Sequence, residues 1–309
     1  MATSAPEDRT LELEDGRHLA YTVFGDPAGR PCLFVHGFSS SRWAAGWTLG
    51  QEHARRHGVR LIAVDRPGYG RSTARPGRGF LAWAHDASAL ADHLGLDRLA
   101  VIGVSMGAAP ALALAALRPD LVSSATVLSG MPPIDPGERW RPDSRSDALY
   151  WALARHAPGL LGVLCATSAR AMASAADGDP GRLVGQVERT LPEADRRVLR
   201  ELLVAEHGDA RAAFAADVRE SSRQGGAAMV DDLRRHLRPW GFDPAEVRGP
   251  VFLWHGLDDP KVPVSLARRL ADRLPTGKTR FVPGGHLAAF AHRDEIFDQI
   301  TSAWSDHRG

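Results

Sequence analysis

The segment Gly103-Val104-Ser105-Met106-Gly107 constrains the fold of this chain more than any other segment. It follows an apolar run over 99–104 and precedes an Ala- and Leu-rich run that ends at Leu117. In a Gly-x-Ser-x-Gly turn between a strand and a helix, the backbone turns so sharply that the two flanking residues must lack bulk. The turn holds the hydroxyl outside the sheet, at the positive end of the following helix. The motif is frequent by chance, so its strand and helix context is what makes Ser105 a candidate nucleophile.

Three further segments share one property, which is that each follows a predicted strand. They are His36-Gly37-Phe38, the run from His255 to Pro263, and Gly284-Gly285-His286. Loops that follow parallel strands meet at the carboxyl edge of the sheet, where open α/β folds bind their ligands. We therefore expect these segments to lie near Ser105.

The order of strands and helices predicts the fold class. Apolar or alternating runs predict strands at 10–14, 18–24, 32–35, 60–64, 99–104, 122–128, 251–254 and 280–282. Helical spacing and stop signals predict helices at 47–58, 80–94, 106–117, 264–274 and 294–306. Alternating strands and helices imply right-handed crossovers. We predict an α/β fold with a mostly parallel sheet flanked by helices.

This alternation stops between residues 131 and 247, where no run is typical of a strand. Helical stretches occupy 146–156, 159–176, 181–190, 193–206, 209–223 and 227–237. More than 100 residues between two strands of one sheet are too many for a loop. We predict an all-helical cap over 131–247, inserted into a core formed by 1–130 and 248–309.

Composition excludes several classes of protein. The chain has 309 residues and is 44% hydrophobic, with 38 Lys and Arg against 37 Asp and Glu. Balanced charge provides no field that would attract nucleic acid or an acidic membrane. Two distant cysteines, Cys32 and Cys165, give no disulfide framework and are expected to be packed as small hydrophobic residues. The acidic amino end has no apolar core region, so we do not expect a secretory signal there, nor do we expect an apolar segment of the roughly twenty residues that span a bilayer. We expect a cytoplasmic protein that binds neither nucleic acid nor a membrane.

A serine hydroxyl needs a base, and the base needs a third group that fixes its tautomer. His286 is the candidate base because it follows the last strand on a glycine-rich turn. The acid is expected between serine and histidine in the sequence. Asp258 and Asp259 are adjacent candidates after the strand at 251–254, and Asp135 is a more distant one.

An oxyanion intermediate needs amide donors aimed at its oxygen. The residue after the nucleophile supplies one, the N–H of Met106, and the early loop is expected to supply the N–H of Phe38. His36 is interpreted as a residue that orders this loop. The run from Asp65 to Ser72 matches neither phosphate-loop pattern and is predicted to brace loops near the site. No metal-ligand spacing is present, so we expect neither a metal nor a cofactor.

These motifs together resemble the α/β-hydrolase superfamily over nearly the whole chain, in its branch with a serine nucleophile and a cap. The matching residues are His36-Gly37-Phe38, Asp65 to Ser72, Gly103 to Gly107, His255-Gly256-x-x-Asp259-x-x-Val262-Pro263 and Gly285-His286. The resemblance implies an eight-stranded sheet, and it implies that Asp259 is the acid beside Ser105 and His286.

Two departures from the family pattern leave the subfamily open. Many relatives have His before the nucleophile and Gly after the second motif glycine, where this chain has Val104 and Ala108. The serine itself argues against the haloalkane dehalogenase and epoxide hydrolase branches, which use aspartate at that position.

The expected function is that of a cofactor-independent serine hydrolase acting on a carboxylic ester. The same fold and triad can serve C–C hydrolases, thioesterases, lyases or cyclases, and a non-catalytic binding protein is a further alternative. Cap residues such as Tyr150 and Trp151 could line a pocket for an uncharged, partly apolar small molecule, although ordinary packing also explains them. The sequence does not indicate an oligomeric state.

Overall fold

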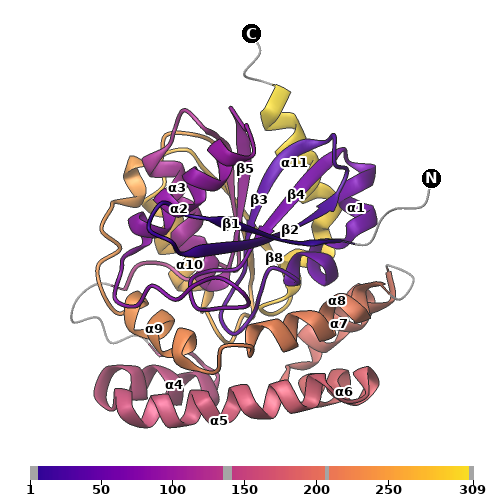
Figure 1. Cartoon of the computed structure of the whole chain (residues 1–309), viewed down its shortest axis with the longest axis vertical. Helices are drawn as coiled ribbons and strands as arrows, with labels where there is room; N and C mark the ends of the chain where they lie inside the picture. The colour runs from indigo at the N-terminus through magenta and orange to yellow at the C-terminus, as the bar shows by residue number, and fades with distance from the viewer. Residues whose placement is uncertain (1–5, 135–140, 206–208, 306–309) are drawn as a thin grey trace.

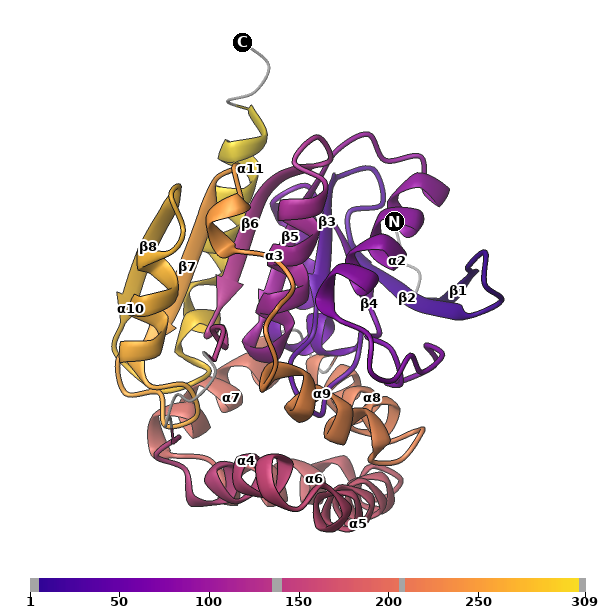
Figure 2. The same cartoon turned by 90° about the vertical axis from the view of Figure 1, so that its left-hand side faces the viewer.

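A mixed eight-stranded sheet forms the centre of the molecule (Figures 1 and 2). The computed structural model describes residues 6–134, 141–205 and 209–305. Within them the strands lie in the order β1-β2-β4-β3-β5-β6-β7-β8. Their bounds are β1 Asp8–Glu12, β2 His18–Gly25, β3 Arg30–Val35, β4 Val59–Val64, β5 Leu99–Val104, β6 Val122–Leu128, β7 Val251–Gly256 and β8 Gly277–Val282.

Strand direction confirms the predicted fold class. β1 and β2 pair antiparallel, and β2 pairs antiparallel with β4. All pairs from β4 through β8 are parallel. The four central strands are buried over most of their length on both faces, which fits a parallel sheet covered by helices on each side. The carboxyl ends of β3, β5, β6 and β7 therefore meet at one edge.

Helices cover both faces of this sheet. One face carries α2 Phe80–His93, α3 Ala108–Leu117 and α10 Val264–Asp272. The other carries α1 Gln51–Arg56 and α11 Arg293–Ser305, together with the π-helix η1 Gly46–Gly50 and the 3-10 helix η4 Ala288–His292 (Figures 1 and 2). A further 3-10 helix, η2 Ser105–Gly107, leads into α3, and η3 Pro244–Glu246 precedes β7.

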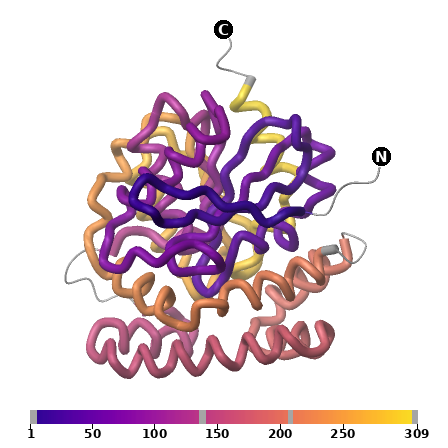
Figure 3. The backbone as a smooth tube through the Cα atoms, in the orientation of Figure 1, coloured from indigo at the N-terminus to yellow at the C-terminus, as the bar shows by residue number. Residues whose placement is uncertain are grey.

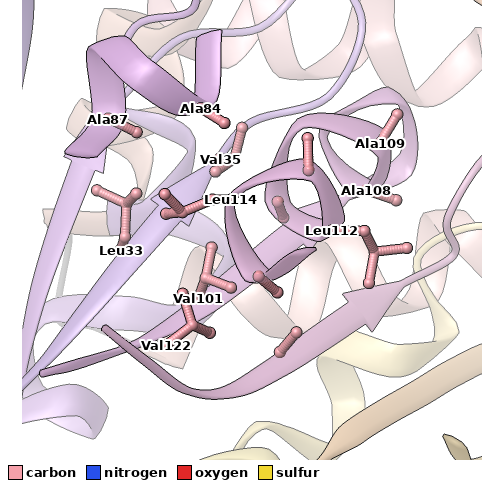
Figure 4. Packing of buried hydrophobic residues seen from close by; sticks show 14 of the residues in the cluster. Leu33, Val35, Ala84, Ala87, Val101, Ala108, Ala109, Leu112, Leu114 and Val122 are labelled. Atoms are coloured by element: carbon pink, nitrogen blue, oxygen red, sulfur yellow. The ribbon is translucent and has the colours of Figure 1, made fainter. Parts of the chain in front are cut away.

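Small side chains let α3 pack closely on the centre of the sheet. Residues 108–115 are all buried, so this helix lacks the polar face that a helix at the protein surface shows. Figure 4 shows Ala108, Ala109 and Leu112 of this helix among Val101 and Leu33 of the neighbouring strands. Burying a leucine or valine contributes about 1.5–3 kcal/mol, so this cluster fixes where the chain leaves the serine turn.

Both cysteines confirm the expectation that they pack as small hydrophobic residues. Cys32 and Cys165 are free and buried. Burial raises the pKa of the Cys165 thiol to about 11, so the thiol is protonated at neutral pH.

In the described part of the chain between β6 and β7, six α-helices lie across the carboxyl edge of the sheet (Figures 1 and 2). We call them the helical insertion: α4 Arg145–His156, α5 Pro158–Ala176, α6 Pro180–Thr190, α7 Glu193–Ala205, α8 Asp209–Ser221 and α9 Ala227–His236. α8 and α9 lie nearer the sheet than α4, α5 and α6, and Figure 3 traces the return of the chain from α9 along the side of the core. The domain limits 131 and 247 stay a prediction.

Helix α5 corrects the expectation that the chain has no apolar segment long enough to span a bilayer. It has 19 residues and a mean hydropathy of 1.3 over its most apolar window, so by length and composition it could cross a membrane. In the sequence, Ala and Gly with Thr167 and Arg170 among them do not form a continuous, strongly apolar run. Its buried residues Leu161, Cys165 and Ala169 recur every four positions and form one side of the helix.

Buried charges attach the helical insertion to the core. Asp232 of α9 accepts hydrogen bonds from both terminal guanidinium nitrogens of Arg66, at 2.6 and 2.7 Å, and from the Tyr69 hydroxyl at 2.8 Å. Asp217 of α8 accepts the Ser41 N–H at 2.6 Å. Burial raises the pKa of Asp232, but the charge and hydrogen bonds of Arg66 outweigh it and hold this pKa below 3.8.

Replacing Asp232 with Asn should lower the free energy of unfolding by about 3–5 kcal/mol at pH 7, because it leaves the buried Arg66 charge unpaired. A carboxyl group whose pKa is lower in the folded state than in the unfolded state stabilises the fold at pH values above its unfolded-state pKa. This contribution to the free energy of unfolding is lost as the pH falls through the folded-state pKa. The deficit should therefore stay constant from pH 7 to about 4 and shrink at lower pH, measured by urea unfolding. Arg66→Met with Asp232→Leu should cost less than Asp232→Asn alone; a larger cost for the pair would contradict this account.

Candidate active site

Ser105 stands on a strained turn that only its glycine neighbours allow. Its φ is +51°, a left-handed value that is uncommon for residues other than glycine. A Cβ on Gly103 would lie 2.5 Å from the Gly107 oxygen, and a Cβ on Gly107 would lie 2.3 Å from the Val35 oxygen. The serine carbonyl accepts the Met131 N–H at 3.0 Å. The backbone thus holds Ser105 between the end of β5 and the start of α3.

The loop after β3 lies beside this serine. A Cβ on Gly37 would be 3.3 Å from the Ser105 Cβ, so the two backbones are in close contact. His36 is fully buried: its Nε2 accepts the Arg66 N–H at 3.0 Å, and its Nδ1 therefore donates to the Gly37 oxygen at 2.9 Å. Burial, with the Arg66 charge next, holds the pKa of His36 well below 6.5. A neutral His36 orders the loop that carries Phe38.

Asp259 and His286 form a direct hydrogen bond. The Nδ1 atom of His286 lies 2.7 Å from Oδ2 of Asp259, and Oδ1 of Asp259 accepts the N–H groups of Lys261 and Val262 at 2.9 and 3.1 Å. Burial raises the pKa of Asp259, but the charge and hydrogen bond of His286 outweigh it, so this pKa lies below 3.8. The ionised carboxylate holds the proton on Nδ1, so Nε2 is the ring nitrogen of His286 that can accept a proton.

Of the other two candidate acids, Asp258 does not take this place. Asp258 is exposed, and its N–H is bonded to the Gly284 oxygen at 2.9 Å. Asp135 lies outside the described residues.

The main chain of His286 is held by two further residues that sequence reasoning missed. Asp195 of α7 accepts the His286 N–H at 3.1 Å and the Leu287 N–H at 2.8 Å. Ser129, just after β6, donates its hydroxyl to the His286 oxygen at 2.7 Å. Nothing in the sequence distinguishes Asp195 from the neighbouring acids of an amphipathic helix.

Ser105 and His286 line one cavity between the sheet edge and the helical insertion. Phe38 and Met106, whose amides are the predicted oxyanion donors, line it too. Met106 follows Ser105 at the start of η2, where helical N–H groups have no partner within the helix. The cavity thus brings together four of the five predicted site residues, and Asp259 lies behind His286.

The remaining lining of the cavity is mostly apolar. It comes from Phe34, Trp47, Met131, Tyr150, Trp151, Leu233, Val262, Leu287 and Phe290, among others. Asp147 of α4 and Lys261 add a charged pair, with Lys261 Nζ 3.0 Å from Asp147 Oδ2. No group of three or more His, Cys, Asp and Glu side chains that could hold a metal occurs in the part of the chain that the structure describes.

Comparison with known proteins places this geometry in a family. A family model described as the alpha/beta hydrolase fold matches residues 30–292. Among curated proteins, the chain is 34% identical over 127 residues to a non-heme chloroperoxidase of Streptomyces lividans, covering 40% of this chain and 45% of that one. It is 32% identical over 129 residues to a probable proline iminopeptidase of Streptomyces coelicolor, covering 39% of each. The matched stretches span less than half of these relatives.

Solved structures agree on the fold across the whole chain. An alpha/beta hydrolase fold protein from Chitinophaga pinensis superposes with a TM-score of 0.65 at 15% identity, covering 99% of both chains. At this identity the likeness concerns the fold alone.

Replacing Gly107 with Ala should lower the free energy of unfolding by about 1–3 kcal/mol, because the new methyl group meets the backbone oxygens of Val35 and His36. Gly162→Ala in α5 is the matched control, since nothing lies within 4 Å of its Cβ position. The control should leave stability unchanged or raise it by up to about 1 kcal/mol. Equal effects of the two substitutions in chemical denaturation would show that the turn is not closely packed.

Proposed function

The chain belongs to the α/β-hydrolase-fold family, and on that premise we propose that it is a serine hydrolase acting on a carboxylic ester or a related acyl substrate. One observation carries the proposal. His286, whose Nδ1 is bonded to the buried carboxylate of Asp259, lines the same cavity as Ser105 on its strained turn. A nucleophile, a base and a group that fixes the tautomer of the base are the parts that acyl transfer through serine requires.

The proposed reaction proceeds through an acyl-enzyme. The Ser105 Oγ attacks the acyl carbon while Nε2 of His286 takes its proton, and Asp259 stabilises the imidazolium that forms. The amides of Phe38 and Met106 donate to the oxyanion of the tetrahedral intermediate. His286 then gives its proton to the leaving alcohol as the C–O bond breaks. A water molecule, deprotonated by His286, then attacks the acyl-enzyme; the bond between the acyl carbon and the Ser105 Oγ breaks, His286 returns the proton to that oxygen, and the acid leaves.

The cavity lining supports a partly apolar, uncharged acyl group. Aromatic rings such as Phe38 and Tyr150, which pack edge to face with centroids 6.1 Å apart, offer contacts to apolar substrate atoms. The charge of Lys261 is balanced by Asp147 at the same cavity. A bound carboxylate would have to compete with that pair, which disfavours anionic substrates.

Replacing Ser105 with Ala should abolish turnover of p-nitrophenyl esters, lowering kcat by at least about 10⁴-fold with folding intact. Ser265→Ala, an exposed serine of α10, is the matched control and should keep wild-type kcat and KM. Circular dichroism and thermal unfolding check that each variant folds. Ester turnover by the Ser105 variant at the wild-type rate would refute the assignment of the nucleophile.

A panel of acyl substrates determines which bond is cleaved. Relatives named as a peroxidase and a peptidase leave the bond type open, so the panel includes esters, thioesters, lactones, amides and C–C bonds alpha to a carbonyl. We expect the highest kcat/KM on a short or medium-chain ester. Labelling of Ser105 by a fluorophosphonate without ester turnover would instead favour a thioesterase, C–C hydrolase, lyase or cyclase. Stoichiometric binding without turnover would favour a binding protein.

A further inference from the structure

One carboxylate of the helical insertion reaches the loop that carries His286. Asp195 lies in the first turn of α7, and its side chain is fully buried. Its two oxygens accept the N–H groups of His286 and Leu287 at 3.1 and 2.8 Å. A buried carboxylate is costly unless hydrogen bonds satisfy it, so this contact is a specific attachment.

The loop is shaped to receive that carboxylate. A Cβ on Gly285 would lie 2.6 Å from both Asp195 oxygens, so glycine is required where the acid approaches the backbone. On the other side, the Ser129 hydroxyl donates to the His286 oxygen at 2.7 Å. The N–H of His286 is thus held by the insertion and its C=O by the core, while its ring is held by Asp259.

We propose that Asp195 is a positioning residue that sets the orientation of the His286 imidazole from the helical insertion. Asp195 touches the backbone on either side of the histidine Cα and does not line the cavity. It therefore acts through His286 rather than on the substrate. On this account the insertion supplies part of the catalytic arrangement in addition to the walls of the pocket.

Loss of this contact should change catalysis more than substrate binding. Without the carboxylate, residues 285–287 lose two hydrogen bonds, and the imidazole moves relative to both Asp259 and Ser105. A displacement of about 1 Å at a catalytic group can cost about 10²-fold in rate. The cavity walls stay in place, so KM should change little.

The test compares Asp195→Asn and Asp195→Ala with Glu193→Ala, a matched control on the same helix whose side chain is 71% exposed. We expect kcat on the best ester to fall about 10²-fold in the Ala variant, with KM unchanged. In the Asn variant kcat should fall less, because the side-chain amide oxygen can still accept a hydrogen bond from one of the two N–H groups. Gly285→Ala, whose new methyl group displaces the Asp195 carboxylate, should lower kcat by as much as Asp195→Ala does. The control should keep wild-type values.

A second measurement is independent of turnover, which matters because the catalytic effect rests on the proposed function. The proton between Nδ1 of His286 and Asp259 should give a low-field proton NMR resonance that Asp259→Asn removes. In Asp195→Ala this resonance should shift or broaden, and in Glu193→Ala it should not change. If the wild-type protein cleaves no acyl substrate, the function proposed above fails, and this resonance alone decides the role of Asp195. Wild-type kcat and an unshifted resonance in folded Asp195→Ala would overturn the proposal, as would a rise in KM at constant kcat.

Discussion

The close approach of backbone to backbone around Ser105 is the constraint on which the rest of the site depends. A Cβ on Gly103 or Gly107 would lie 2.5 or 2.3 Å from a backbone oxygen, and a Cβ on Gly37 would lie 3.3 Å from its nearest neighbours. This packing brings the ends of β3 and β5 together and holds Ser105 at a φ of +51°. Such strain costs about 1–3 kcal/mol and persists only where the surroundings fix it. The buried α3 behind the turn provides that fixation.

Buried acids of the helical insertion hold the loops that surround this turn. Asp217 binds the backbone of the loop after Phe38, and Asp232 binds Arg66, which in turn donates to the Gly37 oxygen at 2.7 Å. Asp195 binds the backbone of the histidine loop. Each of these side chains is at least 95% buried. The insertion and the core are thus joined by polar contacts that only a specific arrangement satisfies, and a loosely packed lid would leave these groups unpaired.

Much of the core could be predicted because it rests on local patterns. The apolar strands 32–35, 60–64, 99–104 and 122–128 and the helices after them follow from periodicity, and the structure confirms them with small shifts of their ends. Loops that follow parallel strands meet at the carboxyl edge of the sheet, and this expectation predicted that Ser105, Phe38, Met106 and His286 lie close together, as their shared cavity shows. The supporting contacts could not be predicted. Asp195 and Ser129 lie 91 and 157 residues from His286, and their roles depend on how segments far apart in the sequence pack together. The length of the apolar helix α5 is likewise not evident from the sequence, because polar residues interrupt it.

The most direct test of this account is a crystal structure of the protein after reaction with a fluorophosphonate. The account predicts phosphorus bonded to the Ser105 Oγ, its free oxygen within hydrogen-bond distance of the Phe38 and Met106 amides, and Nε2 of His286 facing the leaving-group position. Labelling of another residue would contradict it. So would an adduct on Ser105 whose oxygen points away from both amides while His286 stays bonded to Asp259.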